Sequence, residues 1–87
     1  MYLHLGQSVM IRQEEIIGIF DLDNTTSSHR TRRFLERAER EGRLAAASEE
    51  LPKSFVVCQT GGKAPVVYLS QLSAATLRGR AENNSFE

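Results

Sequence analysis

The feature that most limits the fold of this chain is its short length without a covalent or metal crosslink. It has 87 residues and one cysteine, Cys58, so it cannot form an intrachain disulfide. Its two histidines, His4 and His29, lack metal-ligand spacing. A domain of this size buries only about 60–65% of the surface that its unfolded chain exposes. The fold must therefore rest on an apolar core, and association between copies is a natural source of further stability.

The composition indicates a globular domain, with 40% hydrophobic and 25% charged residues. No apolar run approaches the roughly 18 residues of a membrane span, and the first residues lack the pattern of a signal peptide. A single unpaired cysteine fits the reducing cytoplasm. We therefore expect a cytoplasmic protein with one domain over residues 1–81 and a disordered polar tail over residues 82–87.

Three short strands are predicted in the first quarter of the chain, over residues 2–5, 8–12 and 14–22. The third contains the apolar run Ile16-Ile17-Gly18-Ile19-Phe20. Such a run predicts burial on both faces, in the sheet or in a subunit contact. Gly18 within it predicts a β-bulge or a close backbone approach.

A main helix is predicted over about residues 27–41. Residues 24–28 are all N-cap formers, and Gly42 supplies the left-handed position after the last turn. The helical period places four residues on the core face, namely Thr31, Phe34, Leu35 and Ala38.

The rest of the chain predicts a strand within residues 43–48, a loop over 48–52, a hairpin of strands 54–59 and 65–70, and a short C-terminal helix over about residues 73–80 that Ser73 caps. The expected fold class is α+β, a small single domain with an antiparallel-rich sheet of about five or six short strands.

The formal net charge is zero, but the charge is unevenly distributed. Residues 1–23 carry −3 and residues 24–43 carry +3, and the chain has nine arginines against two lysines. On the main helix, Arg32–Glu36 and Glu39–Arg43 are predicted i,i+4 pairs. A separate stripe is compensated only in part, and it consists of Arg30, Arg33, Arg37 and Arg40.

This arginine stripe has two interpretations. It is a candidate site for DNA phosphates, or it is a face that meets solvent or the acidic segment of a neighbouring subunit. Lys53, Arg78 and Arg80 are lesser DNA-binding candidates, and the last two also suit the negative end of a helix dipole.

Asp21-Leu22-Asp23-Asn24-Thr25 resembles the first motif of the haloacid-dehalogenase phosphatases. That chemistry also needs a phosphate-neutralising base, a later acidic pair and a much longer chain, so we interpret the segment as a strand end and an acidic turn. Cys58 is expected to be a small buried hydrophobe. We predict no enzyme, no catalytic or metal-binding residue, no cofactor and no small-molecule substrate.

Taken together, the chain resembles the bacterial extracellular-matrix (biofilm) regulators of the RemA/RemB type, and the RemB type most closely. The resemblance covers about residues 2–80. Its carriers are Tyr2-Leu3-His4-Leu5-Gly6, Ile16-Ile17-Gly18-Ile19-Phe20-Asp21, Phe34-Leu35, Leu51-Pro52-Lys53-Ser54-Phe55-Val56-Val57, Tyr68-Leu69-Ser70, Leu72-Ser73 and Thr76-Leu77.

The resemblance implies a DNA-binding transcription regulator of matrix genes that forms a ring-like homo-oligomer presenting basic residues. RemA members carry a basic pair before the fifth strand, where this chain has Glu49 and Glu50 followed by Lys53. Two hypotheses follow. One is an oligomer that contacts the DNA backbone through repeated arginines, and the alternative is an oligomeric scaffold that acts through a partner regulator without binding DNA.

Overall fold

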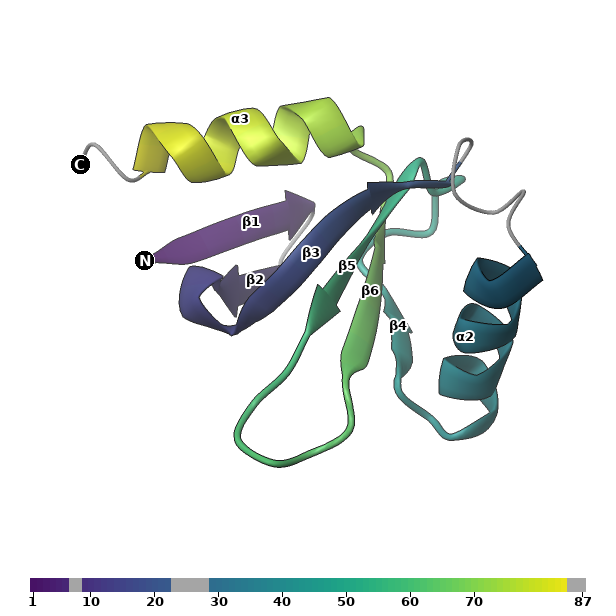
Figure 1. Ribbon diagram of the computed structural model, residues 1–87. Coiled ribbons are helices and arrows are strands. Elements are labelled where there is room, and N and C mark those ends of the chain that lie inside the picture. Colours follow the sequence, from purple (N-terminus) through teal and green to yellow (C-terminus); the bar gives the residue numbers. More distant parts are fainter. Residues whose placement is uncertain (7–8, 23–28, 85–87) are drawn as a thin grey trace.

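The computed structural model describes residues 1–6, 9–22 and 29–84, and these form an α+β fold of two layers around a sheet (Figure 1). The fold class predicted from the sequence is confirmed. In chain order the elements are β1 (Tyr2–Gly6), β2 (Val9–Arg12), the 3-10 helix η1 (Gln13–Glu15), β3 (Ile16–Asp21), α2 (His29–Arg40), β4 (Leu44–Ala46), β5 (Ser54–Cys58), β6 (Val66–Ser70) and α3 (Ala74–Asn84).

The strands form two sheets. Strands β1 and β2 pair as an antiparallel hairpin, and the larger sheet has the order β3-β5-β6-β4. Within it, β5 pairs antiparallel with β3 and with β6, while β4 runs parallel to β6. The predicted hairpin is confirmed as β5 and β6. The strands predicted over residues 2–5 and 14–22 are also confirmed, as β1 and β3.

Strand β5 lies at the centre of the core, because all five of its residues are buried. Side chains alternate between the two faces of a strand. Phe55 and Val57 pack in a cluster with Ala38 of α2, whereas Val56 and Cys58 pack with residues of β1, β2 and α3. One strand therefore anchors two apolar layers, one on each face of the sheet.

Helix α2 packs against β4 and β6, and its core face is the predicted one. Ala38 is fully buried, and Phe34 and Leu35 pack beside it. The helix ends at Arg40, and Gly42 in the turn that follows has a φ of 72°, in the left-handed region. The backbone N–H of Arg43 donates to the Ala38 carbonyl at 2.8 Å, and that of Gly42 donates to the Glu39 carbonyl at 3.1 Å. The predicted cap at residues 24–28 lies outside the described residues.

Helix α3 packs against β1 and β3. It begins as predicted, since the backbone N–H of Thr76 donates to Ser73 Oγ at 3.1 Å. The predicted end at Arg80 is wrong, because α3 continues to Asn84, so residues 82–84 are helical rather than part of a tail. A contact distant in sequence holds this extension: Gln13 Nε2 donates to the Ala81 carbonyl at 3.1 Å.

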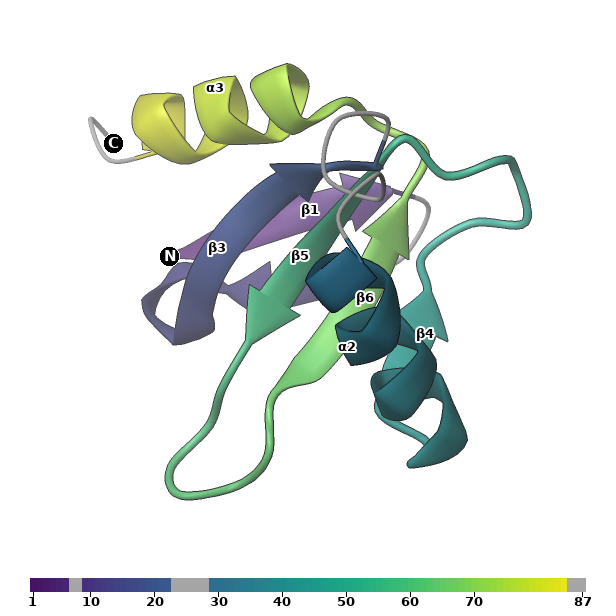
Figure 2. The same cartoon turned by 45° about the vertical axis from the view of Figure 1, so that its right-hand side comes forward.

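Strand β3 differs most from its prediction. It starts at Ile16, because residues 13–15 form η1, and it is an edge strand of the larger sheet. Burial of its apolar run on both faces of the sheet is therefore wrong: Ile17 is 57% exposed and Phe20 is 37% exposed. In Figure 2, α2 crosses in front of β6 and leaves β3 uncovered.

The bulge predicted at Gly18 is confirmed, because the β3–β5 register shifts between Ile16 and Gly18. A Cβ at Gly18 would lie 2.6 Å from the ring of Phe20. That ring stacks on Phe55, with centroids 5.1 Å apart. Glycine at this position thus leaves the space in which the exposed phenylalanine ring lies against the core.

We expect Leu77→Ala to lower the free energy of unfolding by about 2–5 kcal/mol, because Leu77 is fully buried between α3 and the sheet. Urea unfolding followed by circular dichroism measures this change. Gly79→Ala on the same helix is the control: an added Cβ there meets nothing within 4 Å, so it should raise stability by about 0.4–1 kcal/mol. A neutral Leu77→Ala would contradict the packing of α3.

Candidate nucleic-acid interface

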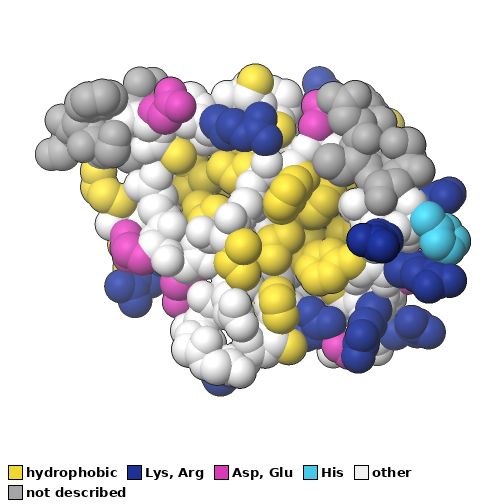
Figure 3. Space-filling view, viewed as in Figure 1, with side chains coloured by type: hydrophobic (Ala, Val, Ile, Leu, Met, Phe, Trp, Pro, Cys, Tyr) yellow, Lys and Arg dark blue, Asp and Glu magenta, His cyan; other side chains and the backbone are white. Residues whose placement is uncertain are grey.

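The solvent face of α2 carries the predicted arginine stripe. Because Phe34, Leu35 and Ala38 pack toward the sheet, the positions on the opposite side of the helix face outward. All four stripe residues are exposed, namely Arg30, Arg33, Arg37 and Arg40. Figure 3 shows Lys and Arg side chains gathered over α2 at one side of this face. The side chains thus lie where a polyanion could approach them.

One carboxylate, Glu41, connects the end of the stripe to the body of the domain. Arg37 Nε lies 3.2 Å from Glu41 Oε2, and Arg43 Nη2 lies 2.6 Å from Glu41 Oε1. Hydrogen bonds from Arg43 and from Arg37 hold the pKa of Glu41 below its ordinary value, so this carboxylate stays charged. Arg43 also donates to the Pro65 carbonyl, which fixes it in a structural role.

The predicted i,i+4 pairs Arg32–Glu36 and Glu39–Arg43 are wrong, since neither is an ion pair in the described part of the chain. Arg43 lies beyond the Gly42 turn and pairs with Glu41 instead. Of the four stripe residues, only Arg37 has a carboxylate within ion-pair distance among the described residues.

A hollow of about 240 Å³ opens beside the stripe, and the residues that line it are His29, Arg32, Arg33 and Glu36. It brings Arg33 together with two residues that sequence reasoning did not select, Arg32 and His29. Their spacing was the available signal, because positions three and four apart lie side by side on a helix. The hollow concentrates cationic groups against a single carboxylate, an arrangement that suits a phosphate oxygen.

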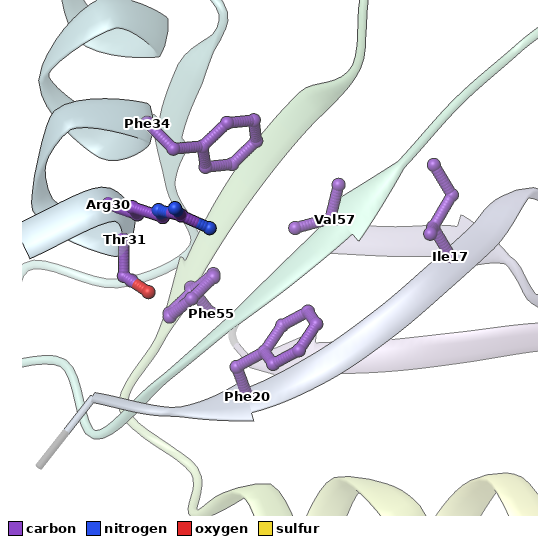
Figure 4. Close-up of a pocket in the computed structure, with 7 residues that line it drawn as sticks. All are labelled: Ile17, Phe20, Arg30, Thr31, Phe34, Phe55 and Val57. Atoms are coloured by element: carbon purple, nitrogen blue, oxygen red, sulfur yellow. The ribbon is translucent and has the colours of Figure 1, made fainter. Parts of the chain in front are cut away.

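A second concavity of about 350 Å³ lies between β3, β5 and α2 (Figure 4), and we call it the β3–α2 groove; it is lined by Ile17, Phe20, Arg30, Thr31, Phe34, Phe55 and Val57. Its walls are almost entirely apolar. Figure 4 shows the Arg30 side chain reaching toward the groove from the α2 side. Sequence reasoning missed this groove, although the apolar run of β3 was its signal.

The lesser candidates do not join the stripe. Arg78 and Arg80 lie on α3, which packs on other strands than α2 does. Arg78 Nη2 donates to the Ile19 carbonyl at 2.6 Å, and Arg80 Nη1 donates to the His4 carbonyl at 3.5 Å. Lys53 is exposed, and its backbone N–H donates to the Ser70 carbonyl at 2.8 Å. These three cations therefore lie at separate places, two of them tied to backbone carbonyls.

Comparison with known proteins now decides the family. A family model described as RemA-like, extracellular matrix regulatory protein A-like, matches residues 2–81. The chain belongs to this family. It is also 32% identical over 82 residues to extracellular matrix regulatory protein B of Bacillus subtilis (strain 168), a match that covers 94% of this chain and 91% of the relative. The resemblance inferred from the sequence is confirmed, and membership of this family supports a role in matrix regulation.

The acidic residues considered for a phosphatase-like site lie in different segments of the chain. Asp21 ends β3, whereas Glu49 and Glu50 lie exposed in the loop before β5, and Asp23 lies outside the described residues. Across residues 1–6, 9–22 and 29–84 no group of three or more His, Cys, Asp or Glu side chains forms a possible metal site. None of the described helices has the length and apolar character needed to cross a lipid bilayer.

Cys58 is buried in β5, as predicted. Burial, and secondarily the charge of Glu15, raises the pKa of its thiol to about 11. A thiolate is the reactive form, so this cysteine is protonated and unreactive at neutral pH.

We therefore expect the Cys58 thiol of the folded protein to react with a disulfide reagent at pH 8 about 100-fold more slowly than in urea, where its pKa returns to about 8.5. Absorbance of the released thiolate measures both rates. The native rate should rise with pH toward 11. A fast native reaction at pH 8 would contradict the burial of β5.

Proposed function

We propose that this chain is a DNA-binding transcription regulator of extracellular-matrix (biofilm) genes, acting in the cytoplasm as a homo-oligomer. The observation that carries the proposal is the exposed arginine stripe on α2, in which one of four members is ion-paired within the described part of the chain. The family is one of matrix regulatory proteins, which favours a regulatory rather than an enzymatic role.

The stripe matches the geometry of a phosphate backbone. At 1.5 Å rise per residue, Arg30 and Arg40 lie about 15 Å apart along α2. Duplex DNA carries one negative charge per roughly 1.7 Å of its axis, so several phosphates lie within this span. Guanidinium groups bind phosphate oxygens through paired N–H donors. The contacts we propose are with the backbone, which contributes affinity rather than sequence selectivity.

A neutral protomer has no strong attraction for DNA at long range, so several copies must act together. Linked copies turn later contacts into intramolecular ones, which raises the overall affinity without any new kind of contact. This argument supports a homo-oligomer as the binding species, with the α2 stripes repeated along its surface.

We expect Arg33→Glu/Arg37→Glu to weaken binding to duplex DNA at least tenfold, and to reduce the salt dependence by about one unit of slope per lost phosphate contact. Fluorescence anisotropy of a labelled duplex over a salt series measures both quantities. Arg12→Glu/Lys63→Glu is the matched control, because it changes the net charge equally at exposed sites outside α2. Equal losses in the two double variants, or none in the first, would refute a DNA-binding role for the stripe.

A second prediction uses Glu41, which holds Arg37. Glu41→Gln should tighten DNA binding by roughly 1.5–5-fold, the value of one exposed ion pair, because it releases Arg37 toward phosphate. The control Glu39→Gln removes the same charge from an exposed carboxylate that makes no ion pair among the described residues. The same anisotropy assay compares the two variants, and equal effects would mean that Arg37 is not a DNA contact.

The alternative is an oligomeric scaffold that acts through a partner regulator and does not bind DNA. The exposed apolar side chains Ile17 and Phe20 favour it, because an apolar patch beside charged residues is typical of a protein contact. If wild-type oligomers form and dissociate with salt while duplex DNA is never retained, this second function replaces the first.

A further inference from the structure

The β3–α2 groove presents apolar surface that the described residues of its own chain do not cover. Three phenylalanines, Phe20, Phe34 and Phe55, line it together with Ile17, and Figure 3 shows hydrophobic side chains collected in the middle of this face. Arg30 lies on its rim, and in the described residues no carboxylate pairs with it. An occupant should therefore be apolar and should bring a negative charge.

The chain carries such a group on another side of the molecule, in the loop of residues 48–52, which we call the Leu51 loop. Leu51 is 87% exposed, the most exposed large apolar side chain of the described residues. Glu49 and Glu50 precede it, both exposed and both without an ion pair among the described residues. One apolar side chain thus projects directly after two free carboxylates.

Hydrogen bonds hold the Leu51 loop in place. At one end the backbone N–H of Ala47 donates to the Leu69 carbonyl at 2.8 Å, and at the other that of Lys53 donates to the Ser70 carbonyl at 2.8 Å. Between them the N–H of Glu50 donates to Ser48 Oγ at 3.0 Å. A loop fixed in this way loses little conformational entropy when it docks.

The loop cannot fill the groove of its own chain. In Figure 2 it projects outward from the end of the sheet, on the side away from β3. We propose that the Leu51 loop of one copy docks in the β3–α2 groove of a second copy. This inference rests on the homo-oligomer of the proposed function, and it identifies the contact that joins the copies.

The two surfaces are complementary in polarity and charge. Leu51 enters among the phenylalanine rings, which removes an exposed leucine and part of the exposed surfaces of Phe20 and Ile17 from water. The preceding carboxylates lie on the side of Arg30, where a charge-assisted hydrogen bond can form in a partly desolvated site.

The contact joins two different surfaces, so each copy uses its loop on one side and its groove on the other. Such a heterologous contact produces a closed ring or an open filament, not a two-fold dimer. Every copy is then related to the next by the same rotation. This repeats Arg33, Arg37 and Arg40 of the arginine stripe at regular intervals along one surface, while Arg30 lies at the contact between copies.

The test measures mass in solution by sedimentation velocity, without DNA, over a range of protein concentrations. Leu51→Ser and Ile17→Ser should each raise the dissociation constant of self-association roughly 10–100-fold, the effect of leaving one leucine or isoleucine exposed. Met10→Ser is the control, because Met10 is 58% exposed but lies outside the groove. Circular dichroism confirms that each variant is folded.

Mixing the two variants tests the heterologous contact directly. Leu51→Ser retains its groove and Ile17→Ser retains its loop, so a mixture should form one-to-one dimers that grow no further, while each variant alone is monomeric. Arg30→Glu and Glu50→Arg should each weaken assembly, and the double variant should restore it.

Three results would overturn the inference: assembly that is unaffected by Leu51→Ser, a mixture that stays monomeric, or a wild type that is monomeric at every concentration. The first two leave the proposed function intact, because DNA binding and oligomer formation are measured on the wild type. A wild type that is monomeric at every concentration would also refute the homo-oligomer of the proposed function. The salt series would still test whether the arginine stripe binds DNA.

Discussion

The burial of β5 on both faces is the constraint on which the rest of the structure depends. The hairpin β1–β2 and α3 shield Val56 and Cys58 from solvent on one face of the sheet. Helix α2 packs with Phe55 and Val57 on the other face. The elements on both faces of the sheet must therefore pack on the same five-residue strand. The position of α2 follows from this demand, and so does the outward direction of its arginines. The stripe is thus a consequence of core packing as much as of helix sequence.

Much of this arrangement could be predicted from local patterns. The period of α2, its Gly42 terminus, the Ser73 cap and the β5–β6 hairpin are all encoded within a few residues, and the structure agrees with them. The open face of β3 was not predictable in this way. A continuous apolar run looks the same whether its second face is covered or not, and the edge position of β3 is a property of topology. The extension of α3 likewise depends on Gln13, which is distant in sequence.

For the candidate site, helical spacing predicted which arginines share a face but not how they pair. Glu41 binds Arg43 as well as Arg37 because the Gly42 turn brings Arg43 back toward the helix end. The predicted Glu39–Arg43 pair assumed that residues 39–43 form a continuous helix, and this assumption misses the turn at Gly42. The hollow at Arg32 and Arg33 and the groove beside β3 arise from the way α2 crosses the sheet, which no single segment determines.

The hydrogen bond from Arg78 to the Ile19 carbonyl has a consequence for how sheets of this protein can grow. An open edge strand is a template to which a strand of another molecule can add, and a cation placed on that edge blocks the addition. Arg78 occupies a carbonyl in the middle of the β3 edge, 2.6 Å away. Continuous sheets across molecules, and the fibrils to which they lead, are thereby disfavoured at this edge. Contact between molecules there is left to side chains, which are easier to reverse than a hydrogen-bonded ladder.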